Sequence, residues 1–179
     1  MIEPKEVRRI LAIAPNWVGD VVMVTPALRA LACRFPGAEL TVAARGAGCD
    51  LLEGLPWIHS FVRLAAKAGV GAMRRALRER GDTPDAAVVF PHSFRAAWQA
   101  LESGARIRVG YDRGGRRCLL THTVPPHREA GKIAPIYMVD EYLELARALG
   151  AEDDQRAPEL AVLDADVEHV RKLLPQGRP

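Results

Sequence analysis

Short runs of apolar residues alternate along this chain with longer stretches in which apolar positions recur at helical spacing. The first run is almost continuously apolar, which is typical of a strand buried on both faces of a parallel sheet. The alternation predicts an α/β fold with a Rossmann-like, doubly wound and mostly parallel sheet. The predicted strands are RRILAIA (8–14), AELTVAAR (38–45), SFVRLA (60–65), DAAVVFPH (85–92) and RIRVGY (106–111), with CLLTHTV (118–124) as a candidate sixth.

The segments between these runs have the apolar spacing of helices. Pro26 interrupts the first of them and leaves two alternatives. Either that helix begins after Thr25, with the threonine as its cap and the proline in its first turn, or it runs through the proline and kinks, which we favour. Ser93 is expected to cap the helix that follows it. The predicted helices are 21–35, 48–55, 71–81, 93–104, 135–151 and 165–174.

Length and composition fit one folded domain. The chain has 179 residues, of which 49% are hydrophobic and 26% charged, and a chain of this size buries roughly two thirds of its unfolded surface. We expect a domain over residues 1–160, followed by a short helix and a linker over 161–179.

The cysteines and the N-terminus bear on the compartment. Cys33, Cys49 and Cys118 lie far apart without CxxC or Cys/His spacing, so we expect neither a metal site nor a disulfide framework. Such cysteine usage favours a reducing compartment. The N-terminus does not read as a signal peptide, and no stretch approaches the roughly 18 apolar residues that suggest a membrane span. We therefore expect a cytoplasmic protein.

Residues with catalytic potential follow the first strand, in PNWVGD (15–20). Ligands of a doubly wound sheet gather beyond the carboxyl ends of its strands. Because this loop lacks the G-x-G-x-x-G pattern, binding of a nicotinamide dinucleotide is disfavoured. Asp20 is a candidate cap of the following helix and a candidate general base that accepts a proton from an attacking hydroxyl, and the two roles can coexist. Trp17 either walls the site or fills the core, and we favour the core.

Three further loops carry basic residues, in PHSFRAAW (91–98), YDRGGRR (111–117) and HREAGK (127–132). A helix N-terminus favours anions, and the planar guanidinium group suits carboxylate and phosphate. Helix capping and solvated charge account for each loop taken alone. Together, and with a net charge of +3, the loops indicate an anion-lined crevice that contains one carboxylate. Its candidate residues are His92, Ser93, Arg95, Arg113, Arg116, Arg117, His127, Arg128 and Lys132.

A family resemblance adds to this picture. ILAIAPNWVGDVVMVTPALRALACRFPGAELTVAAR resembles the opening of the ADP-heptose:lipopolysaccharide heptosyltransferases, in glycosyltransferase family nine. It joins a strand, through a loop that ends in Gly-Asp, to an apolar helix carrying Thr-Pro-Ala-Leu. The resemblance continues through AAVVFPHSFRAAW, RIRVGYDRGGRRCLLTH and YMVDEYLELARALG, so it spans nearly the whole chain. PNWVGD and HSFRAA look more like the second heptosyltransferase, which extends an existing heptose, than the first.

The resemblance implies the N-terminal half of a GT-B glycosyltransferase, which faces an anionic lipopolysaccharide-core acceptor. A C-terminal domain would bind the donor substrate, ADP-heptose, and this half alone would be inactive. The transfer would be inverting and would need no metal or cofactor, with Asp20 as the base. No nucleic-acid partner is implied, and peripheral contact with the inner face of the inner membrane is left open. The residues implied to contact the acceptor are Asn16, Trp17, Gly19, Ser93, Arg95, Arg113, Arg116 and Arg117.

Two alternatives remain open. The chain is a stand-alone module that binds an anionic glycolipid or nucleotide without turnover, or it is a family member with a different sugar acceptor. The one Pro-Gly-Ala in the sequence, at 36–38, lies before the second predicted strand, and no strand with such a loop follows to open the family's donor domain, which favours the binding module for this polypeptide as it stands.

Overall fold

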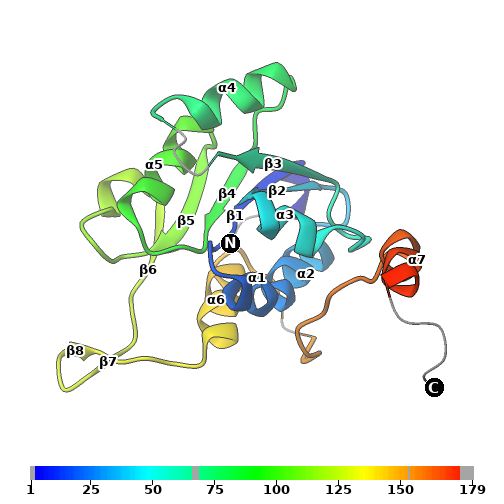
Figure 1. Cartoon of the computed structure of the whole chain (residues 1–179). Helices are drawn as coiled ribbons and strands as arrows, with labels where there is room; N and C mark the ends of the chain where they lie inside the picture. The colour runs from blue at the N-terminus through cyan, green and yellow to red at the C-terminus, as the bar shows by residue number, and fades with distance from the viewer. Residues whose placement is uncertain (1–2, 66–68, 153, 174–179) are drawn as a thin grey trace.

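Six parallel strands form the main sheet, in the order β3-β2-β1-β4-β5-β6 (Figure 1). The computed structural model describes residues 3–65, 69–152 and 154–173. This strand order is that of the doubly wound Rossmann fold, so the predicted α/β class is confirmed. The strands are β1 (Arg9–Ile13), β2 (Glu39–Arg45), β3 (Ser60–Leu64), β4 (Ala86–Val89), β5 (Ile107–Tyr111) and β6 (His122–Val124).

Helices cover both faces of this sheet. One cover consists of α1 (Val18–Met23), α2 (Thr25–Arg34), α3 (Gly46–Leu52) and α6 (Met138–Arg147), and the other of α4 (Ala72–Glu79) and α5 (Phe94–Glu102). Along β1, Ile10 and Ala12 join the first core whereas Leu11 and Ile13 join the second. The continuous apolar run of this strand is therefore needed because both of its faces are buried.

The helical segment after β1 starts earlier than predicted and is broken at one residue, Val24. Pro26 has no N–H to donate to the carbonyl of Val22, four residues back. The Thr25 hydroxyl donates to that carbonyl instead, at 2.8 Å. The helical path thus continues past the proline with an interruption, as in the favoured alternative. Thr25 does not cap α2, since the N-cap position is Val24.

The chain after β5 departs from the predictions in two places. The sixth strand is shorter than expected because Arg117–Leu119 forms a 3-10 turn before it. The basic loop 127–132 contains a hairpin of β7 (Arg128–Glu129) and β8 (Lys132–Ile133). A last helix, α7 (Asp164–Leu173), buries none of its residues, and the predicted linker PQGRP (175–179) lies outside the described residues. No helix in the described part of the chain is long and apolar enough to cross a lipid bilayer.

A buried arginine ties the segment after α6 to α2. Arg29 is 1% exposed and donates to both carboxylate oxygens of Asp154, at 2.7 and 2.8 Å, and to Glu159 at 2.6 Å. Its hydrogen bonds with Asp154 raise the pKa of Arg29 and lower the pKa of the Asp154 carboxyl. The amide of Glu159 also donates to the Thr25 hydroxyl, at 3.0 Å. The polar segment over 154–159 is therefore held against the helix by charge rather than by apolar packing.

A second buried arginine joins two loops at the carboxyl edge of the sheet. Arg116 is fully buried, and its guanidinium group donates to the carbonyls of Tyr111, Pro91 and Ser93. Burial, with a contribution from the charge of Arg113, lowers the pKa of Arg116 to about 10, so the group stays charged at neutral pH. These bonds fix the loop after β4 relative to the loop after β5.

Replacing Arg29 with methionine should lower the free energy of unfolding by about 2 kcal/mol at pH 7, because the buried cation and its hydrogen bonds are lost. This loss of stability is modest because the Asp154 and Glu159 side chains are 32% and 37% exposed, so solvent screens their attraction to Arg29. The folded-state pKa of Asp154 is depressed. The contribution of the pair is therefore present above the ordinary aspartate pKa of about 3.9 and is lost as pH falls below it. Urea unfolding between pH 7 and pH 2 should show the wild type losing more stability than the variant, and parallel losses would contradict this.

Replacing Arg116 with methionine tests whether its hydrogen bonds outweigh the cost of burying its charge. Three carbonyls lose a donor, so we expect the free energy of unfolding to fall by about 1–3 kcal/mol. Arg116→Lys should also be destabilising, because one ammonium group cannot reach all three carbonyls. Thermal unfolding measures both variants. A methionine variant with an unchanged or higher Tm would show that the burial of charge dominates.

Candidate functional site

The two central strands define where a ligand can bind. β1 and β4 pair in parallel, with Ile13 opposite Val89. Beyond their carboxyl ends, the chain from β1 enters α1 on one face of the sheet, and the chain from β4 enters α5 on the other. Neighbouring strands whose connections diverge in this way leave a crevice at the topological switch point. The segments that follow β1 and β4 both border it.

Asp20 lies in a depression of about 250 Å³ at this crevice, on the α1 and α6 side. Its carboxylate is half-buried, and no described side chain or backbone group pairs or hydrogen-bonds with it. Tyr142 lines the same depression. Burial, together with the charge of Asp20, raises the pKa of the Tyr142 phenol, which is therefore protonated at neutral pH. The residues that line this Asp20 depression are Pro15, Asn16, Trp17, Asp20, Phe90, Pro91, His92, Ser93, Met138 and Tyr142.

Asp20 is not the helix cap that one alternative proposed. The N-cap position of α1 is Trp17, whose side chain makes no capping hydrogen bond, and Asp20 is the third residue of the helix. A carboxylate in the first turn still interacts favourably with the helix dipole. Its lining position leaves both of its oxygens available to a ligand.

The preference for Trp17 in the core is wrong. Its side chain is 79% exposed and forms one wall of the Asp20 depression. The apolar interior beneath the loop is filled by other residues, among them Phe90 and Tyr142, whose rings meet edge to face at 5.6 Å. Because the core is complete without it, the indole is left at the mouth of the crevice.

His92 links two charged residues beside the depression. Arg113 Nη1 donates to His92 Nδ1 at 2.9 Å, and His92 Nε2 lies 3.0 Å from Glu141 Oε1. The contact of His92 Nε2 with the carboxylate does not have hydrogen-bond geometry, so this nitrogen has no hydrogen-bond partner among the described residues. Arg113 Nη1 lies 3.9 Å from the same oxygen of Glu141. Glu141 was not predicted from the sequence, because it lies in a helix far along the chain and only the packing of α6 brings it here.

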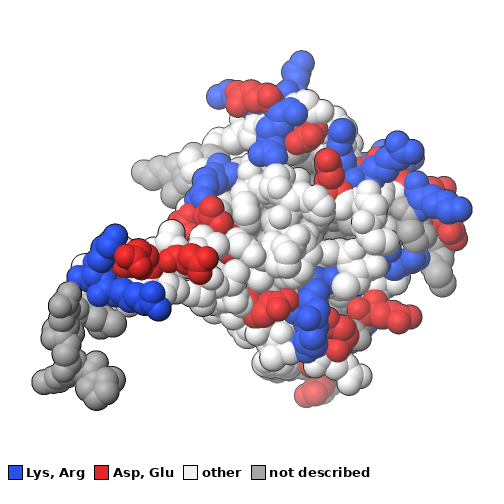
Figure 2. All heavy atoms as spheres, turned by 90° about the vertical axis from the view of Figure 1, so that its right-hand side faces the viewer, with Lys and Arg blue, Asp and Glu red and all other residues white. Residues whose placement is uncertain are grey.

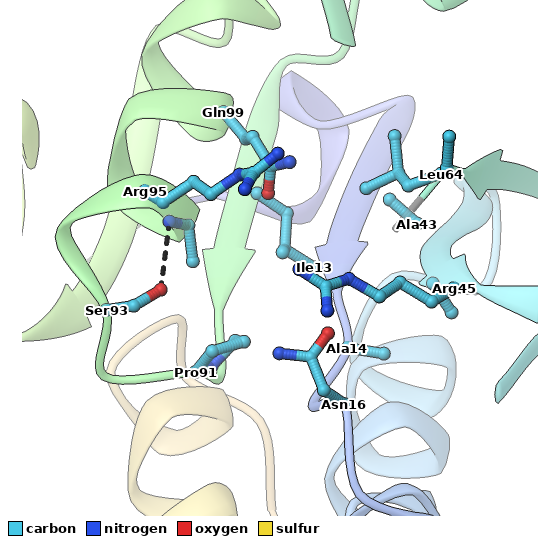
Figure 3. Close-up of a pocket in the computed structure, with 13 residues that line it drawn as sticks. Ile13, Ala14, Asn16, Ala43, Arg45, Leu64, Pro91, Ser93, Arg95 and Gln99 are labelled. Carbon is cyan, nitrogen blue, oxygen red and sulfur yellow. Dashed lines mark hydrogen bonds between the residues drawn. The ribbon is translucent and has the colours of Figure 1, made fainter. Parts of the chain in front are cut away.

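A smaller polar pocket lies on the other side of the crevice, toward α5 (Figure 3). It brings together three predicted residues, Asn16, Ser93 and Arg95, with two that the sequence analysis missed, Arg45 and Gln99. Ser93 caps α5 as expected, since its side chain accepts from the amide of Ala96 at 3.2 Å. Arg45 ends β2, and nothing in its local sequence pattern distinguishes it from a solvated arginine.

The remaining predicted residues lie outside both hollows. Arg117 is exposed and pairs with Asp112 at 2.6 Å. Gly19 is exposed on α1, with open space where a Cβ atom would stand. Arg116 is buried, so we withdraw it from the expected acceptor contacts and give it the structural role described above. In the described residues, no group of three or more His, Cys, Asp or Glu side chains could hold a metal ion.

Similarities to known proteins complete the picture. No protein-family model matches the chain. It is 33% identical over 144 residues to lipopolysaccharide heptosyltransferase 2 of Escherichia coli K12, a match that covers 77% of this chain and 40% of that protein. It is likewise 31% identical over 120 residues to lipooligosaccharide heptosyltransferase 2 of Haemophilus ducreyi, over 63% of this chain and 33% of that protein. The chain therefore spans less than half the length of the curated relatives it matches.

The fold agrees with this similarity. The solved structure of E. coli ADP-heptose LPS heptosyltransferase II superposes with a TM-score of 0.74 and 29% identity, over 96% of this chain and 52% of that one. A family 9 glycosyltransferase from Veillonella parvula gives a TM-score of 0.76 at 18% identity, over 98% of this chain and 52% of that one, which shows the shared fold. The chain is thus related to the heptosyltransferases of glycosyltransferase family nine and matches the N-terminal half of their GT-B structures.

Proposed function

We propose that this chain is the acceptor-binding and base-supplying part of a glycosyltransferase that moves heptose from ADP-heptose to the inner core of lipopolysaccharide. The observation that carries the proposal is the position of Asp20. Its carboxylate lies in the crevice at the carboxyl edge of the sheet, where it has no hydrogen-bond partner or counter-ion among the described residues. A ligand hydroxyl can therefore reach it without displacing an ion pair.

The proposed reaction needs one base on this side of the crevice. An acceptor hydroxyl gives its proton to Asp20 as its oxygen forms a bond to the anomeric carbon of ADP-heptose. The bond from that carbon to the diphosphate oxygen breaks on the opposite side, and ADP leaves with the bonding electrons. A single displacement of this kind inverts the anomeric centre. General-base assistance contributes about 10²- to 10⁴-fold to such a step.

The walls of the Asp20 depression suit a sugar. Trp17 presents an exposed indole ring, and exposed apolar surface beside polar groups marks binding sites. Asn16 and Ser93 provide hydrogen-bonding groups on the same lining. Tyr142 also lines the depression, and its phenol stays protonated partly because of the nearby charge of Asp20. The cation of Arg113, held beside His92, adds attraction for an anionic acceptor.

Turnover by the whole protein is a separate part of the proposal. The chain covers 40% of its E. coli relative, and we propose that ADP-heptose is bound mainly by a further, C-terminal domain. A second candidate function, binding of an anionic glycolipid or nucleotide without transfer, is favoured by the same short coverage. A different sugar acceptor is a third. With an inner-core acceptor, the protein would work in the cytoplasm at the inner face of the inner membrane.

Asp20→Asn should lower kcat by about 10²- to 10⁴-fold, because the amide cannot accept the proton. The measurement uses the longest natural polypeptide that contains this sequence, with ADP-heptose and a heptose-terminated inner-core acceptor. Acceptor affinity should change little, since the amide keeps the shape of the carboxylate.

Asp140→Asn is the matched control, because Asp140 is exposed on α6 and does not line the depression. It should keep wild-type kcat. If the folded Asp20→Asn protein also turned over at the wild-type rate, Asp20 would not be the base. If the wild type bound acceptor but released no ADP, the binding-module function would replace the transferase.

Arg113→Ala should weaken acceptor binding by about fivefold at low salt, because an anionic acceptor loses one charge-assisted contact. Salt screens such an attraction, so the difference from wild type should shrink as ionic strength rises. Isothermal titration of the acceptor at several salt concentrations measures it. Arg128→Ala, on the hairpin outside the crevice, is the control, and a salt-independent wild-type affinity for Arg113→Ala would exclude this contact.

A further inference from the structure

The charged residues that line the polar pocket beside α5 are all positive. They are Arg45, from the end of β2, and Arg95, from the first turn of α5. None of the described lining residues is an aspartate or a glutamate. We call it the arginine pocket, and its lining is Ile13, Ala14, Asn16, Ala43, Ala44, Arg45, Leu64, Ala65, Pro91, Ser93, Arg95, Ala96 and Gln99.

The two guanidinium groups enter the pocket from opposite sides. Figure 3 shows Arg45 reaching in from the β2 side and Arg95 from the α5 side, with Asn16 below them. On the face of the molecule that Figure 2 shows, by contrast, acidic and basic side chains are interspersed. An anion placed between two groups of positive charge that line one hollow is attracted by both of them.

The volume of the arginine pocket and its neutral hydrogen-bonding side chains indicate which kind of anion it can bind. It offers about 30 Å³, against about 250 Å³ in the Asp20 depression, so it admits a small group rather than a sugar ring. Asn16, Ser93 and Gln99 add neutral hydrogen-bonding groups, and the nine-residue helix α5 points its N-terminal end at the same place. Two planar forks with several neutral donors match the oxygens of a phosphate group.

We propose that the arginine pocket binds a phosphate group carried by the acceptor sugar. Asn16, Pro91 and Ser93 line both this pocket and the Asp20 depression. A sugar whose hydroxyl faces Asp20 therefore has a phosphate site directly beside it. The identity of the carrier rests on the proposed function, whereas phosphate binding by Arg45 and Arg95 does not.

Inorganic phosphate is the first probe, titrated into the 179-residue chain at constant ionic strength while amide and guanidinium NMR signals are followed. Arg45→Gln and Arg95→Gln should each raise the phosphate Kd by about tenfold, the effect of losing a charge-assisted hydrogen bond. Arg45→Lys keeps the positive charge but loses the planar guanidinium group, so its phosphate Kd should lie between those of the wild type and Arg45→Gln. Acetate, which lacks the tetrahedral set of oxygens, should bind more weakly than phosphate.

Arg128→Gln is the matched control, because it removes one positive charge from the hairpin, outside the pocket. It should bind phosphate as the wild type does. Equal phosphate affinities for Arg45→Gln, Arg45→Lys and Arg128→Gln, in proteins with native NMR spectra, would overturn the proposal.

A second arm distinguishes a phosphate on the acceptor from free phosphate. Arg45→Gln should weaken binding of a phosphorylated inner-core acceptor by about tenfold and leave binding of the enzymatically dephosphorylated acceptor unchanged. An equal loss for both acceptors would overturn the assignment to the acceptor's phosphate. Failure of the base role would show separately, as full turnover by Asp20→Asn with the phosphate affinity intact.

Discussion

The parallel hydrogen bonding of β1 to β4 is the constraint on which the rest of the molecule depends. It fixes two strand ends side by side, while the helices that follow them pack on opposite faces of the sheet. The space between the diverging connections must stay open, because backbone cannot fill it from either side. Both hollows border this opening and share part of one wall. The proposed base and the proposed phosphate site are neighbours for that reason.

Arginines serve this structure in two ways, and burial separates them. Arg29 and Arg116 are buried, and their hydrogen bonds are to carboxylates and carbonyls of the chain itself, so they hold loops around the sheet. Arg45 and Arg113 keep part of their surface exposed and face the crevice. Burying an unpaired charge is expensive, and the chain meets this cost fully for Arg29, whereas Arg116 bonds to carbonyls through Nε and Nη1 and leaves its Nη2 without a partner among the described residues. A guanidinium group at the crevice can be satisfied by solvent or by an anionic ligand.

The candidate site was predictable as far as local sequence order decides it. Asp20, Asn16 and Ser93 follow strand ends directly, so recognising the strands was enough to place them at the crevice. Glu141 and Tyr142 were out of reach, since α6 meets the crevice only through tertiary packing. Trp17 was expected in the core but is exposed, and Arg116 was expected at the surface but is buried. Tryptophan is more often buried and arginine more often exposed, so residue type alone predicted the wrong environment for both.

The sequence by itself determined the α/β class, the run of strands and helices, and the carboxylate just beyond the first strand. Apolar periodicity and turn residues act over short stretches of chain, so these features can be read locally. The tertiary structure alone decided which arginines are buried, that Trp17 stands at the surface, and that Arg45 and Arg95 line one pocket. Burial and the meeting of residues distant in sequence depend on how helices pack across the sheet. No local spacing of apolar and polar residues encodes that packing.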